Sequence, residues 1–294
     1  MLLYYLYAAS AVIIALVYML FDVFNHREVP NIFAYASLLF AFAVLPLSGN
    51  WNLLVESYLI AFVLLGLGYF IYRVGELGLG YVFELAALSL LLAPLASPIV
   101  SQAVPIATSL PPIVALFLNT GIAAVIVIPL FYLGIVLGRF GSSMTKWVSR
   151  SDVIKAAAVV AAYVAFAALL AQISHARVLL LALILLIVLG SALLLVFQRA
   201  ITEVMVERVG VSGFLEDDII AFNLMSGKEI AAAKRSVGSF DRLVTRKMIA
   251  EMKRKKIKQK FPVYKSAVPF AVPIFIGVVL TLLFGNLLLL ALLG

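Results

Sequence analysis

Four acidic residues lie within or beside long apolar runs of this 294-residue chain: Asp22, Glu56, Glu76 and Glu84. A carboxylate at membrane depth is costly unless it is protonated, paired or wetted, so these acids are the first candidates for a functional role. Two carboxyls that approach each other closely share one proton, and such a pair can activate water and protonate a leaving amine. That is the chemistry of aspartic peptidases. The alternative is that the acids are interfacial charges at helix ends or partners of nearby arginines.

The composition excludes several other chemistries. The chain has no cysteine and only two histidines, so a disulfide, a thiolate nucleophile and a zinc site rich in cysteine or histidine are excluded. A phosphate-binding loop of the GxxxxGK[ST] type is missing from the sequence, which leaves an ATP-driven pump unsupported. We therefore expect no metal and no cofactor, with any catalysis depending on carboxylates or hydroxyls.

The same composition is typical of a membrane protein. Apolar residues make up 65% of the chain, charged residues only 12%, and the mean hydropathy is +1.17. Soluble domains are about 45–50% apolar and about 25% charged, so we predict an all-α polytopic protein of the cell (plasma) membrane. The first apolar run lacks the basic start of a secretory signal, and we interpret it as a retained span. About eight runs can cross roughly 30 Å of hydrocarbon: 2–22, 32–48, 53–72, 81–97, 112–138, 153–173, 178–198 and 268–293.

The basic residues predict how these spans are oriented. If both termini lie outside (N-out, C-out), every one of the 22 Lys and Arg residues except Arg177 lies on the inner side. This orientation places Asp22, Glu76 and Glu84 at the inner face of the membrane and Glu56 at the outer face. Three of the four candidate acids are therefore predicted to gather at one leaflet.

The one sizeable polar stretch, 199–265, is predicted to form a small cytoplasmic fold. Within it, 241–260 has the pattern of a basic helix, and Lys and Arg at this density attract anionic lipid headgroups. We expect no nucleic-acid partner, because the positive-inside rule already explains a basic run beside a membrane. The apolar positions of the basic helix are expected to rest on the bilayer surface: Leu243, Met248, Ile249 and Met252.

Three motifs resemble a known family. HREVPN at 26–31 precedes the second apolar run, GLGYVFELAALSLLLAP at 78–94 opens the fourth, and KSAVPFAVPIFIGVVL at 265–280 opens the last. In order and spacing they resemble the prepilin peptidases, and more closely the archaeal branch that includes the preflagellin peptidases. These are intramembrane aspartic peptidases of the GxGD class, with one Asp ending the first span and a second Asp at the start of the fourth. The motif residues in this chain are Arg27, Pro30, Asn31, Gly78 and Gly80.

The resemblance implies a catalytic pair, but both expected Asp positions are altered. The first would fall on Val23, whereas Asp22 stands one place earlier, a shift of about 100° around an ideal helix. The second is occupied by Tyr81, and the substitute acids are Glu84, on roughly the same helix face, and Glu76, just before the glycines. A phenol is a poor base at neutral pH, although it can donate a hydrogen bond to an oxyanion or to substrate. We predict that Asp22 pairs with Glu84 or, alternatively, with Glu76.

The resemblance also divides the chain into four parts. Residues 1–140 form a peptidase-like membrane core, and 141–198 form an additional pair of transmembrane helices. Residues 199–265 are the basic cytoplasmic segment, and 266–294 form a C-terminal transmembrane helix.

Three functions stay open, of which we favour the first. An active peptidase would remove leader peptides from type IV pilin-like or archaellin-like precursors, whose basic leader precedes an apolar helix. A relative that has lost the catalytic pair would keep the fold and serve as a binding or assembly component. A small-solute transporter is the third, although Asn119 is almost the only polar group expected near the middle of a span.

Overall fold

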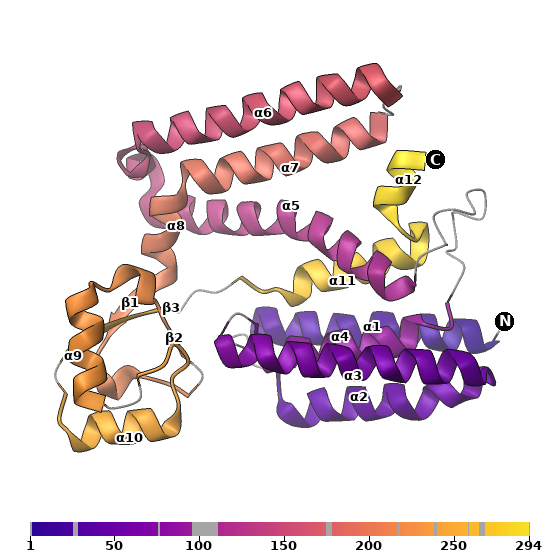
Figure 1. The fold of residues 1–294 in the computed structure, drawn as a ribbon, viewed down its shortest axis with the longest axis horizontal. Helices are drawn as coiled ribbons and strands as arrows, with labels where there is room; N and C mark the ends of the chain where they lie inside the picture. The colour runs from indigo at the N-terminus through magenta and orange to yellow at the C-terminus, as the bar shows by residue number, and fades with distance from the viewer. Residues whose placement is uncertain are drawn as a thin grey trace.

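The computed structural model describes residues 2–25, 29–75, 77–95, 111–174, 178–216, 218–237, 240–257, 259–264 and 268–293 (Figure 1). Six helices within these residues are long and apolar enough to cross a membrane, so the chain is a predominantly helical, multi-pass membrane protein. Two predicted site residues, Arg27 and Glu76, lie outside the described residues. The six long helices are α1 (Leu2–Phe24), α2 (Asn31–Val44, extended by a 3-10 turn over Leu45–Ser48), α3 (Trp51–Val74), α5 (Pro112–Phe140), α6 (Arg150–Ser174) and α7 (Val178–Val196).

The short helix α4 (Leu79–Leu92) is the centre of the first bundle. Every residue from Glu84 to Leu92 is buried, and α4 packs against α1, α2 and α3. A helix that is apolar on all sides can be covered by lipid or by protein, and α4 is covered by its three neighbours, whereas peripheral helices present apolar side chains outward. On α3, Leu59 and Phe62 are exposed in this way. The start of α4, with its acid, is therefore placed inside the bundle.

A second group of helices packs through close contacts at glycine. Helix α5 packs along α7 and α11 (Ala271–Phe284), and α6 packs on α7. A side chain at Gly190 of α7 would collide with the backbone of Val125 on α5, and one at Gly277 of α11 would collide with Thr120 on α5. Small residues let helix backbones approach closely within a membrane. Because α11 also packs on α1, it connects the two groups.

The last apolar run is not the single helix expected over 266–294. It is broken after α11, and the chain resumes as α12 (Leu287–Leu293). Gly285 adopts the left-handed value φ 68°, which favours glycine. Asn119 of α5, fully buried, stabilises the break because its Nδ2 donates to the oxygens of Thr281 (2.9 Å) and Gly285 (2.7 Å), and its Oδ1 accepts from Leu287 N at 3.2 Å. Asn119 thus pairs with backbone groups that the interruption of the helix would otherwise leave without a hydrogen bond.

Residues 206–264 form a small domain with its own core, a fold that mixes helices with a three-stranded sheet. The sheet is antiparallel with strand order β1-β3-β2, and its register pairs Val209 with Phe261 and Ile220 with Val263. Phe261 and Val263 are fully buried at the centre of this core. The elements are α8 (Gln198–Met205), which leads in from the membrane helices, β1 (Val206–Val209), β2 (Ile219–Ile220), α9 (Gly227–Val237), α10 (Arg246–Arg254) and β3 (Phe261–Tyr264).

The basic helix differs from the prediction in its length and in what its apolar face contacts. The helix is α10, shorter than the predicted 241–260. Met248 and Met252 are buried in the core of the small domain, so the prediction that this face rests on the bilayer is wrong. The physical reason is that the sheet and α9 supply a nearer apolar surface, which covers those side chains within the domain itself.

The small domain lies at one end of the helices, and both chain termini lie toward the other (Figure 1). Helix α1 runs toward the small domain and α4 runs away from it, so the C-terminal end of α1 and the N-terminal end of α4 share that end of the bundle. Gly75, between α3 and α4, lies close to Ile219 and Leu243 of the small domain. Asp22 and Glu84 are therefore on the side of the bundle that faces the polar part of the chain.

Candidate active site

Asp22, in the last turn of α1, joins three helices. It is only 1% exposed. Its Oδ1 accepts a hydrogen bond from the Tyr81 hydroxyl at 2.8 Å, and its Oδ2 accepts one from the Ala271 amide, also at 2.8 Å. The Tyr81 oxygen in turn accepts a hydrogen bond from Phe270 N at 3.4 Å. We call Asp22, Tyr81, Glu84 and Ala271 the acid site; its residues come from α1, α4 and α11.

The N-terminus of α11 favours a negatively charged Asp22. Ala271 is the first residue of this helix, and its amide is one of the donors that a helix leaves unpaired at its start. A helix N-terminus carries a partial positive charge, so an anion placed there is stabilised, and hydrogen bonds to an ionised acceptor are stronger than neutral ones. Asp22 is therefore placed to act as a fixed carboxylate.

Glu84 lies one helical turn beyond Tyr81 and has a very different environment. It is fully buried, and neither carboxyl oxygen has a hydrogen-bond partner among the described residues. Its nearest link to the first acid is Tyr81, which lies one turn before Glu84 on α4 and donates a hydrogen bond to Asp22. A buried carboxyl without partners is costly and is rarely kept for stability alone. The arrangement thus combines one acid held by donors with a second acid left unpaired beside it.

The register of α1 explains the displaced acid. Asp22 is buried, whereas the adjacent Val23 is 46% exposed, so position 22 is the one that faces α4 and α11. Adjacent residues on a helix point about 100° apart, which makes the choice between the two positions unambiguous. An acid at position 22 therefore lies on the inner face of α1, where one at position 23 would not.

The two predicted motif turns lie against each other. Pro30 caps α2, which begins at Asn31, and the Pro30 carbonyl accepts hydrogen bonds from the amides of the first turn. A side chain added at Gly80 would come within 3.3 Å of Val29, beside Pro30, and one at Gly78 would come within 3.3 Å of the Tyr81 ring. Glycine at position 80 thus permits a close approach between the start of α4 and the residues just before α2.

Tyr18 is a member of the site region that sequence reasoning missed. It is fully buried one turn before Asp22 on α1, and its hydroxyl shares a 3.0 Å hydrogen bond with Ser37 of α2. The spacing of four residues from Asp22 was a usable signal, because residues four apart share a helix face. The Phe270 and Ala271 amides were also missed, and no local pattern links them to Asp22, which lies 249 residues before Ala271.

The acid site can supply a fixed carboxylate, a second carboxyl and a phenol at the end of an apolar bundle. Within the described residues, no three histidine, cysteine or acidic side chains gather as metal ligands would. Glu56 is exposed at the start of α3, at the opposite end of that bundle from the acid site. Comparisons with models of protein families, with curated proteins and with solved structures find no match for this chain.

Proposed function

We propose that the protein is an intramembrane aspartic endopeptidase that removes leader peptides from type IV pilin-like or archaellin-like precursors at the cytoplasmic face of the cell membrane. The observation that carries the proposal is the burial of both Asp22 and Glu84. They come from two helices that are joined by the hydrogen bond between Tyr81 and Asp22, Glu84 follows Tyr81 by one turn of α4, and Glu84 has no hydrogen-bond partner among the described residues. The resemblance of the motifs around them to the prepilin peptidases supports the same chemistry.

In the proposed reaction the two acids have different tasks. Asp22, held as a carboxylate by Tyr81 and Ala271, takes a proton from a water molecule whose oxygen attacks the scissile carbonyl carbon. Glu84 acts as the general acid and gives a proton to the leaving amine as the carbon–nitrogen bond breaks. The Tyr81 hydroxyl orients Asp22, and its single proton becomes available to the developing oxyanion only if its bond to Asp22 breaks after Asp22 has taken the proton of the water.

The proposal includes an orientation and two kinds of partner. The proposed protein has eight spans: the six long helices, the short helix α4, and a broken span made of α11 and α12. Both termini lie outside the cell, and residues 206–264 lie inside. The macromolecular substrate is a precursor with a basic leader before an apolar helix. Exposed basic residues at both ends of α10, among them Lys247 and Lys253, are available to anionic lipid headgroups.

A specific observation favours a second candidate, a catalytically degenerate binding or assembly protein. Both oxygens of Asp22 are already used by Tyr81 and Ala271, as in a structural clamp between helices. A transporter is supported less, because the amide of Asn119 is used to hold the break between α11 and α12.

The test is leader removal in cells. The protein is co-expressed with precursors from the same genome that carry a basic leader before an apolar helix. The host has no leader peptidase of its own, and cleavage is measured as a decrease in the size of the precursor. We expect cleavage by the wild type and a loss of about 100-fold or more for Asp22→Asn and for Glu84→Gln. Glu56→Gln, the same chemical change at the other end of the bundle, should cleave normally. Unchanged cleavage in both acid variants would exclude this pair, and no cleavage by the wild type would favour the degenerate protein.

A further inference from the structure

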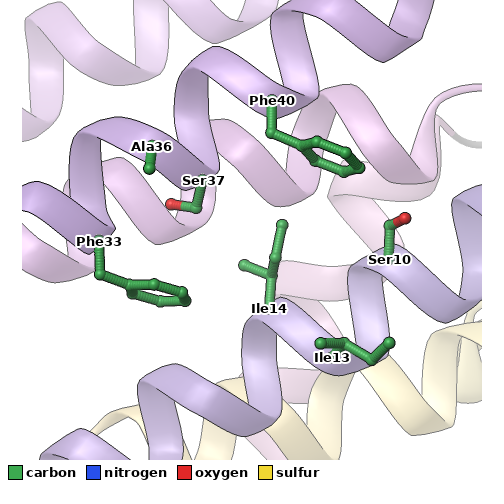
Figure 2. A pocket seen from close by; sticks show the side chains of 7 residues that line it. All are labelled: Ser10, Ile13, Ile14, Phe33, Ala36, Ser37 and Phe40. Atoms are coloured by element: carbon green, nitrogen blue, oxygen red, sulfur yellow. The ribbon is translucent and has the colours of Figure 1, made fainter.

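Asp22 receives its two hydrogen bonds from different groups of helices. Tyr81 belongs to α4 in the first bundle, whereas Ala271 begins α11, which packs along α5 in the second group. Toward α2, α1 instead faces a small apolar hollow, and none of its described lining residues belongs to the acid site (Figure 2). The hydrogen bonds at Asp22 therefore depend on how α4 and α11 are placed relative to each other.

The central strand of the small domain leads toward the start of α11. β3 ends at Tyr264, and Ala271 is the seventh residue after it. An extended chain advances by at most about 3.6 Å per residue, so these two residues are at most about 25 Å apart. Tyr264 is paired on both sides, with Val206 of β1 and with Ile219 of β2. The sheet therefore fixes the point from which the chain runs toward the acid site.

The sheet is also attached to the second group of helices through β1. This strand begins directly after α8, and α8 packs against α5. Ile201 of α8 is buried in one apolar cluster with Tyr132 and Val136 of α5. Since α5 also packs along α11, the sheet and the second group form one continuous packed unit.

Ile219 of β2 connects this unit to the first bundle. It lies against Gly75, the residue that ends α3: a side-chain carbon placed on Gly75 would be 3.9 Å from Ile219, an ordinary van der Waals distance. Leu243, which forms a β-bridge with Ile219, would be equally close to that carbon. Gly75 stands six residues before Tyr81, and α4 begins between them. We call the contact between Ile219 and Gly75 the brace, and it lies at the turn that leads to Tyr81.

We propose that Ile219 is a positioning residue of the acid site. Through the brace it holds the sheet at a fixed distance from the turn between α3 and α4, and so keeps Tyr81 and Ala271 where both can bond Asp22. The catalytic part of this inference rests on the proposed function, in which Asp22 is the base. Ile219 acts by its volume and not by its chemistry, because it is a half-buried apolar side chain. A misplacement of about 1 Å at a reacting group can cost about 100-fold in rate, so a contact remote from the acids can matter.

The kinetic test compares two isoleucines of the small domain in the full-length protein. Ile219→Ala removes the brace, and Ile249→Ala is the matched control, since Ile249 is also half-buried and packs on the core of the same domain. We expect kcat for leader removal to fall about tenfold in Ile219→Ala with KM changed by less than about twofold, and neither constant to change in Ile249→Ala. Ile219→Val keeps most of the volume and should leave kcat within about twofold of the wild type.

Hydrogen exchange gives a second readout that needs no substrate. The Ala271 amide is protected by its bond to Asp22, and it should exchange about tenfold faster in Ile219→Ala than in the wild type or in Ile249→Ala. The amides of β3, measured in the same experiment, report whether the small domain is folded. If Ile219→Ala unfolds the domain, Ile219→Val decides: faster exchange at Ala271 with β3 still protected supports the brace, and unchanged exchange overturns it.

Three outcomes would overturn the inference. Unchanged exchange at Ala271 in both Ile219 variants means that the brace does not hold this amide, and an equal increase in Ile249→Ala means that any loss of domain stability has the same effect. Faster exchange without a loss of kcat means that the brace supports the fold alone. Each of these can be found while the wild type still removes leaders, in which case the peptidase proposal stands. Faster exchange in Ile219→Ala alone, with no leader removal by the wild type, would instead reject the peptidase and keep the brace.

Discussion

At the level of single residues, the two acids of the site differ in their hydrogen-bond partners. Asp22 accepts hydrogen bonds from Tyr81 and Ala271, whereas Glu84 is fully buried with no hydrogen-bond partner among the described residues. An unsatisfied buried polar group costs about 1–3 kcal/mol. Glu84 is therefore expected to lower the stability of the bundle. Stability and activity can be separated at this position.

Glu84→Leu is expected to stabilise the protein and abolish leader removal. Leucine has a similar volume and needs no partner, so the free energy of unfolding should rise by about 1–3 kcal/mol. Thermal unfolding in detergent and the cleavage assay measure the two effects. Glu56→Leu, at an exposed position, should change stability by less than about 0.5 kcal/mol. A loss of stability in Glu84→Leu would show that Glu84 has a partner that stabilises it.

Tyr81→Phe tests whether the Tyr81 hydroxyl orients Asp22 for catalysis or only stabilises the fold. The change keeps the ring but removes the hydroxyl that bonds Asp22 and accepts from Phe270 N. We expect stability to fall by about 1–3 kcal/mol, as for a hydrogen bond to a charged group. The kcat per folded molecule should fall as well, with KM unchanged, because Asp22 loses the group that orients it. If kcat per folded molecule stays constant, Tyr81 is a clamp only.

At the level of elements, α11 connects the acid site to the second group of helices. Its first amide bonds Asp22, Gly277 in its middle touches α5, and its end is held by Asn119. A displacement of α11 along its axis would therefore move the donor at Asp22. The contact at Gly277 is the tightest of these, because a side chain there would meet both the side chain and the backbone of Thr120.

Gly277→Ala is expected to destabilise the protein although alanine is the better helix former. The added carbon forces α11 and α5 apart, at a cost of about 1–3 kcal/mol for overpacking. Gly121→Ala, on the same contact helix α5 but with nothing within 4 Å of the added carbon, should be neutral or stabilising by up to about 1 kcal/mol. Thermal unfolding of the pair measures the difference. Equal effects at the two glycines would contradict the close contact.

The start of α9 in the small domain should be sensitive to acid. The amide of Ser226 donates to Glu229 at 2.6 Å, and the amide of Glu229 donates back to the Ser226 hydroxyl at 3.2 Å. The Ser226 amide first, then the Ser226 hydroxyl and Arg208, lower the pKa of Glu229 below its ordinary value of 4.5. A lowered pKa in the folded state contributes stability above pH 4.5 that is lost as the pH falls through the folded value.

Hydrogen exchange in α9 measures this contribution. At neutral pH the wild type should protect the amides of the first turn better than Glu229→Gln, and the difference should vanish in acid. The two proteins are compared at the same pH, so the intrinsic effect of pH on exchange cancels. Lys228→Gln, next in sequence but without the reciprocal bonds among the described residues, is the control. A difference that persists below the folded pKa would mean that charge plays no part in this cap.

At the level of the whole molecule, the acid site and the small domain lie at one end, with the termini toward the other (Figure 1). The orientation predicts that Lys253→Cys reacts with a membrane-impermeant maleimide only after the cells are permeabilised, whereas Glu56→Cys reacts in intact cells. Both positions are exposed, and no other cysteine competes. The reverse pattern would place the acid site outside and exclude cleavage at the cytoplasmic face.

The position of most helices could be predicted, because long continuous apolar runs can be recognised in the sequence as membrane spans. The central place of α4 could not, since a short run looks like a poor span until its neighbours are known to cover it. The small sheet was also hidden, because β2 has two residues and pairs with a strand some forty positions later. The break at Gly285 depends on Asn119, far away in the sequence.

The acid site was predictable only where its signal is local. Asp22, Tyr81 and Glu84 stand out as an acid at a helix end and as departures from a motif; the structure bonds Tyr81 to Asp22 and buries Glu84 one turn further along α4. The amide of Ala271 carries no side-chain signal, because any residue at the start of α11 would offer the same donor. Whether the buried acids cut a peptide bond depends on water and substrate, which residue types alone do not specify.

The contact between Asp22 and Ala271 also sets an order of biogenesis. Asp22 emerges early from the ribosome, whereas its donor belongs to α11, made 249 residues later. During synthesis the first four helices can assemble, but the acid lacks the amide that fixes it until the last apolar run has been inserted. The acid site of the nascent chain is therefore incomplete until α11 has been made, and Asp22 gains its final hydrogen bonds only after that step.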